Sequence, residues 1–327
     1  MPSITASSNE ALSSPAMKKL KAVQPFLHPG SINFKYSPFK AWKEIGGQRA
    51  KGLYPPRALH GIAFKCSFPR ICRCREARLM FAEPVSISFD TFPYYLSHDI
   101  VPFLWDCWPC YYNKVEEWLR RYKVKAAIFT SRQEMEEISR RLPELKVFHC
   151  PEGIDETLYH EGRPLSERTI DLLEFGRSNE IIIPKGFLFE GINHVTTKVG
   201  EKFIFSNEQL YAAMADAKLT ICLPRSITHP QLAEGVETLT QRYWEAMLSR
   251  ILIVGHAPQE LIDLMGYNPC IEVDFSSPIA QITNILSHIS DYQTFVDRNR
   301  LKAMEIAPWR IRMKHVRAWL EEIGYQV

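Results

Sequence analysis

The sequence contains no run of about 18 uncharged apolar residues, the length that a bilayer-spanning helix needs, so no transmembrane helix is expected. Its first residues are small and polar and lack the basic-then-apolar order of a secretory signal peptide. The eight cysteines follow no disulfide-framework spacing. These absences together predict a reduced, cytoplasmic chain.

Several motifs are also missing. No Gly-x-Gly-x-x-Gly follows an early strand, which argues against a dinucleotide-dependent dehydrogenase. No internal repeat of fixed period is present. Cys72-x-Cys74, with arginines around it, matches no common zinc spacing, so no metal ligands and no cofactor are expected.

The chain has 327 residues, of which 46 % are apolar, and this length suggests two domains. Charge is divided unequally between the halves. Residues 1–150 hold 23 Lys and Arg against 13 Asp and Glu, a net of +10, whereas residues 151–327 hold 17 against 24, a net of −7. A basic first half suits peripheral contact with an anionic membrane or with an acidic acceptor, and the alternative is unequal surface charge alone.

Strand-like and helix-like segments alternate along most of the chain, which is typical of parallel α/β sheets covered on both faces. Residues 1–16 are expected to be disordered, 17–23 to form a short basic helix or the end of this tail, and 24–85 show no clear pattern. Ser131 and Glu134 form the Ser-x-x-Glu pattern of a helix start. We expect strands at 85–89, 100–105, 124–130, 146–150, 169–175, 202–205, 219–223, 251–254 and 271–273, and helices at 115–122, 131–141, 207–217, 239–249, 258–264, 279–290 and over most of the chain from 292.

The most informative stretch is 234–255, which we interpret as a loop, a helix and a buried strand. Thr238 is a suitable N-cap and Gln241 completes a capping box, so the helix should begin near Leu239. The free N–H groups of Thr238, Leu239 and Thr240 and the positive end of the helix dipole would then form an anion site, suited to a diphosphate.

Two carboxylates flank this predicted anion site. Glu237 precedes the cap and Glu245 lies seven residues beyond it, roughly 10 Å along the helix axis. A carboxylate accepts two hydrogen bonds from a vicinal diol, which ribose and a hexose both present. This order suits a nucleotide-sugar, and the alternative is a surface helix with two solvated carboxylates.

Glu237 and Glu245, followed by Ala246-Met247, resemble the donor-site motif of retaining glycosyltransferases with the GT-B fold. The resemblance implies that the first glutamate contacts the donor sugar and the second the nucleotide ribose. Pro151-Glu-Gly-Ile-Asp155 resembles the hinge that leaves the first domain of that family. The family usually has glycine where this chain has Arg250. The resemblance covers roughly residues 100–275.

The resemblance implies two Rossmann-like parallel-sheet domains that face a central cleft. After the tail 1–16, residues 17–155 would form an acceptor-side domain and 156–308 a nucleotide-sugar donor domain. Residues 309–327 would form a helix that returns to the first domain.

Further site residues follow from the ends of strands. In the family a basic residue at the turn held here by Arg177 contacts the donor diphosphate, and Lys185 would be the second cation; the alternative for each is a surface residue. Asp106 follows a buried strand at its carboxyl end, where ligands bind in open parallel sheets. It would orient an acceptor hydroxyl; the alternative is an N-cap or turn aspartate beside core tryptophans.

Aromatic and histidine side chains near Asp106 are acceptor-side candidates. Many family members have histidine where this chain has Trp105. Trp105 or Trp108 would stack on a sugar face, and His98 is a second candidate; the alternative is core packing. His256, at a strand end, is a pocket candidate.

The function that the resemblance implies is retaining, metal-independent transfer of a hexose from a nucleotide-sugar to a hydroxyl of a glycan, a lipid-linked glycan or a small molecule. Nucleic acid is not an expected partner. The alternative is a non-catalytic module that binds a nucleotide-sugar or a glycan on the same scaffold.

Overall fold

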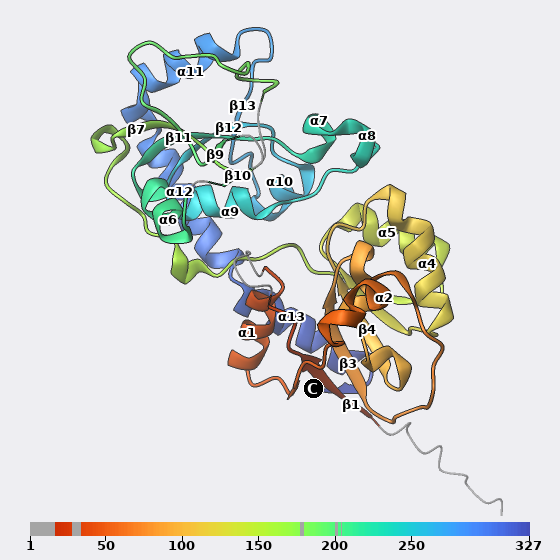
Figure 1. The fold of residues 1–327 in the computed structure, drawn as a ribbon. Coiled ribbons are helices and arrows are strands. Elements are labelled where there is room, and N and C mark those ends of the chain that lie inside the picture. The colour runs from red at the N-terminus through yellow and green to blue at the C-terminus, as the bar shows by residue number, and fades with distance from the viewer. Residues whose placement is uncertain (1–16, 28–33, 177–179, 200–201, 204) are drawn as a thin grey trace, which may run out of the picture.

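The computed structural model describes residues 17–27, 34–176, 180–199, 202–203 and 205–327, and the predicted disordered tail lies outside these ranges. The chain forms two α/β domains joined near residue 155 (Figure 1). Each contains its own parallel sheet, as the sequence predicted. None of the described helices is both long and apolar enough to cross a membrane.

The first domain is built on a sheet with strand order β14-β1-β3-β4-β5-β6, in which β2 also pairs with β1 and all pairs are parallel. All six residues of β3 are buried, which places this strand in the middle of the domain. The strands are β1 (Lys18–Val23), β2 (Arg49–Ala50), β3 (Ala77–Ala82), β4 (Asp99–Leu104), β5 (Ala126–Phe129), β6 (Lys146–His149) and β14 (Tyr325–Gln326).

Two interpretations of the first domain were wrong. Residues 18–23 form strand β1 rather than a basic helix or a tail, because Leu20 and Ala22 are buried in the core while Lys21 pairs with Glu76 at 3.1 Å. Residues 85–89 are not a strand: Pro84–Ser86 forms a 3₁₀ turn that leads into helix α3 (Ile87–Asp90). Proline at the first helical position favours this start.

The second domain contains a parallel sheet with strand order β13-β12-β11-β7-β8. From β7 the chain goes first to β8 on one side and then to β11 on the other, so the order reverses between β7 and β11. The predicted strand at 202–205 is only β10 (Lys202–Phe203), which pairs antiparallel with β9 (Lys198–Val199) outside this sheet. The strands are β7 (Ile170–Glu174), β8 (His194–Thr196), β11 (Ala217–Cys222), β12 (Leu252–Gly255) and β13 (Ile271–Glu272).

Most of the predicted helices are present in the structure, close to their predicted positions. Those of the first domain are α1 (Tyr36–Glu44), α2 (His60–Lys65), α3, α4 (Tyr112–Arg121) and α5 (Arg132–Arg141). The rest are α6 (Asn207–Ala215), α7 (Arg225–Thr228), α8 (Pro230–Ala233), α9 (Gln241–Leu248), α10 (Gln259–Met265), α11 (Pro278–Ser287), α12 (Gln293–Ile306) and α13 (Trp309–Glu322).

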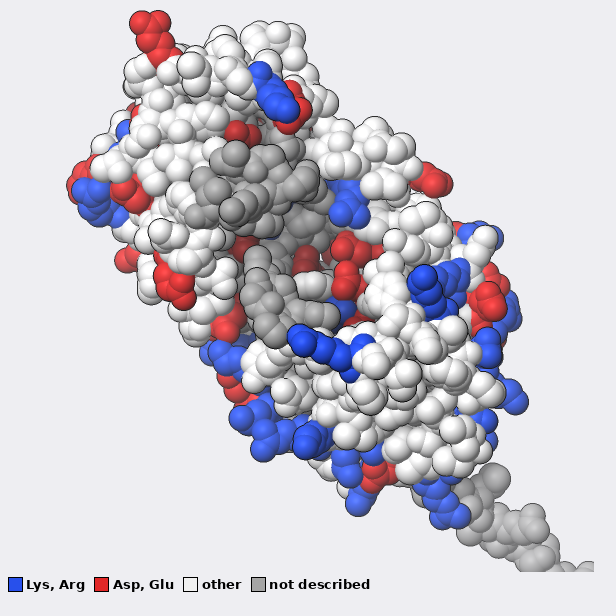
Figure 2. All heavy atoms as spheres, in the orientation of Figure 1, with Lys and Arg blue, Asp and Glu red and all other residues white. Residues whose placement is uncertain are grey.

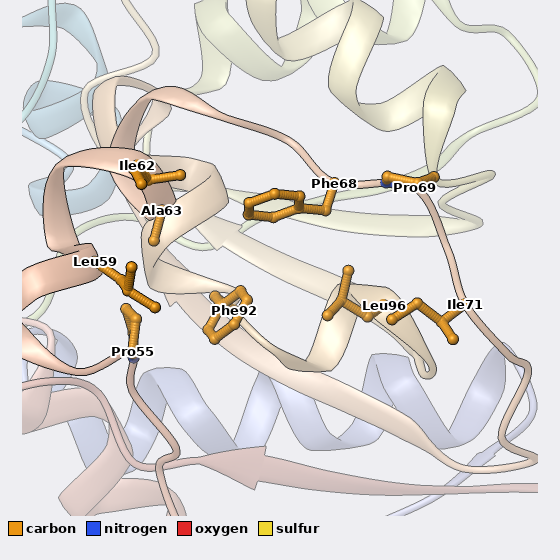
Figure 3. Close-up of a pocket in the computed structure, with 9 residues that line it drawn as sticks. All are labelled: Pro55, Leu59, Ile62, Ala63, Phe68, Pro69, Ile71, Phe92 and Leu96. Carbon is orange, nitrogen blue, oxygen red and sulfur yellow. The ribbon is translucent and has the colours of Figure 1, made fainter.

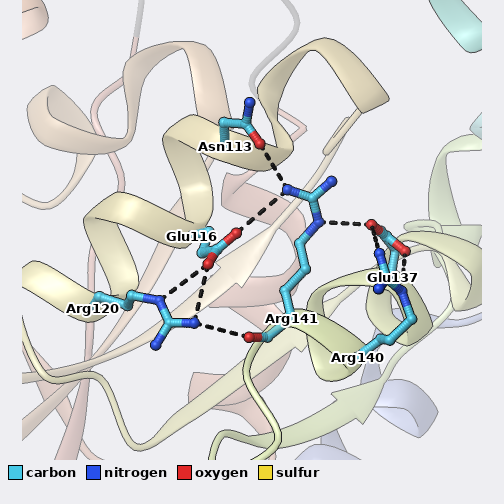
Figure 4. Close-up of polar contacts among 6 residues, drawn as sticks. All are labelled: Asn113, Glu116, Arg120, Glu137, Arg140 and Arg141. Carbon is cyan, nitrogen blue, oxygen red and sulfur yellow. Dashed lines mark hydrogen bonds and ion pairs between the residues drawn. The ribbon is translucent and has the colours of Figure 1, made fainter.

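A surface network of ion pairs joins α4 to α5 (Figure 4). Arg141 lies 2.6 Å from Glu137 on its own helix and 3.4 Å from Glu116 on α4. Hydrogen bonds from Arg140 and Arg141 lower the pKa of Glu137 to about 2. These contacts link the exposed sides of α4 and α5 on the first domain.

The end of the chain belongs to the first domain. In Figure 1, α13 crosses to this domain and lies beside α1. Trp309 and Met313 of α13 are buried in the same apolar cluster as Leu20 and Phe103, and β14 extends the sheet beside β1. The second domain is thus inserted before an element that completes the first.

Arg250 makes the turn between α9 and β12 in a left-handed conformation, with φ of 53°. This conformation strains a non-glycine residue. Its guanidinium is held by the carbonyl oxygen of Gly162 at 2.8 Å and by Asp297 at 2.9 Å. These contacts allow an arginine where the resembled family usually has glycine.

Candidate functional site

Figure 2 shows a hollow between the two domains, with acidic side chains at its rim. From the first domain, Asp106 follows β4 and is exposed, with φ of 51°. A left-handed aspartate at the carboxyl end of a parallel strand is typical of a functional turn. Asp106 therefore lies at the end of its sheet where the sequence predicted it.

In the second domain, the reversal of strand order between β7 and β11 marks the expected ligand crevice. Gly176 follows β7 with φ of 78°, and a Cβ there would lie 2.8 Å from Cδ of Arg242. Leu223 follows β11 directly. Glycine at 176 thus makes room for the arginine at the crevice.

Helix α9 begins two residues later than predicted. Its N-cap is Thr240, without a side-chain cap hydrogen bond, and the helix starts at Gln241. The capping box from Thr238 to Gln241 is wrong, because Thr238 and Leu239 are both buried and Leu239 packs in the core of the second domain. Of the three residues predicted for an anion site, only Thr240 lies at the helix start, and its buried hydroxyl has no partner among the described residues.

Glu237 lies in the loop before this helix and makes polar contacts on several sides. Its Oε1 accepts a hydrogen bond from Ser226 at 3.2 Å and lies 3.4 Å from Nε2 of His256. Its backbone N–H donates to Gln133 of the first domain at 2.8 Å. The Nδ1 atom of His256 lies 2.7 Å from Glu272, so the imidazole ring stands between two carboxylates at the edge of the site.

Glu245 lies within α9 and accepts a hydrogen bond from the Tyr159 hydroxyl at 3.0 Å. Burial raises the pKa of Glu245, although the hydrogen bond from Tyr159 and the charge of Arg242 act against this rise. The two glutamates of the motif are therefore placed on the loop and on the helix on either side of the α9 N-terminus.

Arg242 is the main site residue that the sequence did not reveal. Only 8 % of its surface is exposed, and it forms no ion pair within the described part of the chain. Its Nη2 donates to the carbonyl oxygen of Leu223 at 2.9 Å, whereas its buried Nη1 has no hydrogen-bond partner among the described residues. A buried charge is normally paired, so this free donor at the crevice indicates an anionic ligand. In the sequence it stands just before the buried aromatic pair Tyr243-Trp244, and it gave no signal there.

Two further carboxyl groups in this region are buried. Glu134 accepts a hydrogen bond from the backbone N–H of Cys107 at 3.1 Å instead of capping its own helix with Ser131. Burial and the charge of Asp106 raise the pKa of Glu134 well above its usual value. Burial and the charges of Asp106 and Glu245 do the same for Glu152 in the hinge. These acids are thus favoured in their protonated, neutral form.

The two tryptophans predicted for the acceptor side are both buried. Trp105 is buried and stacks on Phe103 at 4.5 Å, so its ring is not open to a sugar. Trp108 is buried beneath the guanidinium of Arg225, which lies 4.6 Å above the ring and comes from the second domain. Both tryptophan rings are packed in the protein interior, which agrees with the alternative of core packing.

His98 lies at the wrong end of the sheet for this site. It precedes β4, whereas Asp106 follows it, which separates the two by roughly 20 Å at about 3.3 Å per residue. Its Nδ1 lies 2.8 Å from Ser97 Oγ. Because ligands bind at carboxyl ends, the acceptor-side role of His98 was wrong.

Of the two predicted cations of the donor site, the structure describes only Lys185. Arg177 lies outside the described residues. Lys185 is exposed in a turn and forms no ion pair with a described residue. In the described ranges, no group of three His, Cys, Asp or Glu side chains is arranged to hold a metal ion.

The two domains touch directly across the hollow. Glu260 of α10 accepts from His149 of the first domain at 2.8 Å, and Asp263 lies 2.8 Å from Arg132. The indole N–H of Trp244 donates to the carbonyl oxygen of Glu152 at 2.8 Å. These bonds hold Asp106 and the start of α9 on facing walls of one site.

No protein-family model and no curated protein matches the sequence. Solved structures do match the fold. HepE from Anabaena in complex with UDP-glucose aligns with a TM-score of 0.54 at 12 % identity, over 93 % of this chain and 98 % of that one. A UDP-forming α,α-trehalose-phosphate synthase from Burkholderia vietnamiensis aligns at 0.53 and 11 %, over 93 % and 97 %. A sucrose-phosphate synthase from Thermosynechococcus elongatus aligns at 0.51 and 13 %, over 91 % and 80 %. With two parallel-sheet domains facing one site, the chain therefore has the GT-B fold found in these glycosyltransferase structures.

Proposed function

We propose that the protein is a retaining glycosyltransferase that moves a hexose from a nucleotide-sugar to a hydroxyl acceptor. The observation that carries this proposal is the buried guanidinium group of Arg242 at the crevice between β7 and β11, whose Nη1 has no partner among the described residues. It lies at the start of α9, between Glu237 and Glu245. A diphosphate is the ligand that this charge and the helix N-terminus both favour.

The donor site has a distinct role for each group. Arg242, Arg177 and Lys185 would neutralise the diphosphate, and Thr240 would donate its free hydroxyl. With cations in these positions, no bound metal is required. Glu245 would accept from the ribose hydroxyls and Glu237 from the sugar.

The acceptor would bind on the first-domain wall, where Asp106 orients its hydroxyl. The leaving diphosphate would take the acceptor proton on the same face of the sugar, so that the protein acts by positioning and by electrostatic stabilisation. The raised pKa values of Glu134 and Glu152 suit this chemistry, because they disfavour ionised carboxylates, which would repel the diphosphate. The protein would work in the cytoplasm, in glycan biosynthesis.

The test is release of free nucleoside diphosphate from a panel of nucleotide-sugars, with and without a panel of hydroxyl acceptors. Because HepE was solved with UDP-glucose, this donor is the first to test. The configuration of the product at the anomeric carbon, read by NMR, decides between retention and inversion. Binding of a nucleotide-sugar without turnover under any acceptor would instead favour the non-catalytic module. Buried Trp105, in place of the histidine usual in the resembled family, supports that second reading.

A further inference from the structure

One segment of the first domain differs from the rest of the surface in charge. Residues 45–75 contain seven Lys or Arg and no Asp or Glu. The seven are Arg49, Lys51, Arg57, Lys65, Arg70, Arg73 and Arg75. Arg70 pairs with Asp99 at 3.3 Å, and none of the other six forms an ion pair within the described ranges. The charge of the basic first half is therefore concentrated and largely unneutralised here.

The same segment exposes large apolar side chains and opens an apolar pocket. Ile71 is 76 % exposed and Ile62 49 % exposed, with Leu59 and Phe68 also on the surface. Figure 3 shows Leu59, Ile62 and Phe68 around a common space with Phe92 and Leu96. The cavity has a volume of about 600 Å³.

We propose that this basic apolar face, residues 45–75, docks on an anionic lipid bilayer and that its pocket takes one lipid acyl chain. The cations complement the negative headgroups, and the exposed apolar side chains enter the boundary between headgroups and chains. Exposed apolar groups of this kind on a soluble surface mark an interaction site. A nucleic acid would use the cations but not an apolar pocket, so the lipid is favoured. The proposal does not depend on glycosyl transfer.

Sedimentation with vesicles tests the proposal on the full chain. Vesicles of phosphatidylcholine with phosphatidylglycerol should bind the protein, and binding should weaken as salt rises. Vesicles of phosphatidylcholine alone should bind it far less. The combined substitution Arg57→Gln, Lys65→Gln and Arg73→Gln should lower the partition coefficient about fivefold for each cation and reduce the salt dependence.

A pair of apolar variants separates the lipid contact from charge alone. Ile62→Ser with Ile71→Ser should lower partitioning by about tenfold for each isoleucine at every salt concentration. The matched control is Leu301→Ser with Phe275→Ser in the second domain, where the side chains are 73 % and 48 % exposed. This control should bind vesicles like the wild type. Thermal unfolding by circular dichroism checks that each variant is folded.

Three results would overturn the proposal. The first concerns vesicle binding: the wild type does not bind anionic vesicles at low salt, or the second-domain control loses as much vesicle partitioning as the isoleucine variant. The second is tight binding of a single-stranded oligonucleotide that the isoleucine variant leaves unchanged while vesicles are ignored. The third is a wild-type dimer in light scattering that the isoleucine variant dissociates without any effect of vesicles, which would assign the face to a second copy of the chain.

Discussion

Replacing Arg242 by methionine should separate ligand binding from folding stability. Hydrogen bonds to a charged group contribute about 1.5–3 kcal/mol each, so losing one bond to the diphosphate should weaken nucleoside diphosphate binding by roughly 10- to 150-fold. The folded protein loses the bond to Leu223 and is relieved of a buried charge that forms no ion pair with a described residue. Its free energy of unfolding should therefore stay within about 1 kcal/mol of the wild type. Calorimetric titration and urea unfolding measure the two quantities.

Arg168 provides the matched control in the same domain. It is equally buried, but its guanidinium donates to the carbonyl oxygens of Arg163, Ala217, Ser249 and Glu161. Arg168→Met should destabilise the protein by at least about 3 kcal/mol, because several buried carbonyls lose a charged donor. The folded fraction should still bind the nucleotide normally. Unchanged affinity in Arg242→Met would refute the phosphate role of Arg242.

Three further changes test the site. Glu237→Gln should leave affinity for a free nucleoside diphosphate close to wild type and lower sugar transfer by the order of 10²-fold, in a coupled assay; near-normal transfer would remove Glu237 from the donor site. Glu245→Ala should weaken nucleotide binding by about 1–3 kcal/mol in calorimetry, and no change for any base would contradict the ribose role. Glu134 has a raised pKa in the folded state, so its contribution to stability is present below about pH 4.3, its unfolded value, and is lost as pH rises through the folded pKa. Glu134→Gln should therefore reduce the loss of stability between pH 5 and 8 in urea unfolding, and an unaltered loss would show that the carboxyl is not held neutral.

The alternation of strands and helices could be predicted because it depends on local patterns. Strands β4, β5 and β11 are short apolar runs that end at turn residues. Helix α5 begins after Ser131, where the Ser-x-x-Glu pattern predicted a start, although without the capping hydrogen bond. The GT-B fold was implied by the resemblance of the residues around Glu237 and Glu245 to the donor-site motif, where a loop, a helix and a buried strand follow one another.

Only the tertiary structure decided which of these residues meet. Lys18–Val23 is a strand because β3 and β14, distant in the sequence, pair with it. Thr238 is buried and does not cap α9, and Glu134 accepts from the backbone N–H of Cys107 across the fold instead of capping α5. Arg242 belongs to a helix that packs in the core, and its place at the crevice depends on Gly176 after β7 and Leu223 after β11, which the fold brings next to it. Contacts between distant segments set these positions, and a local pattern does not contain them.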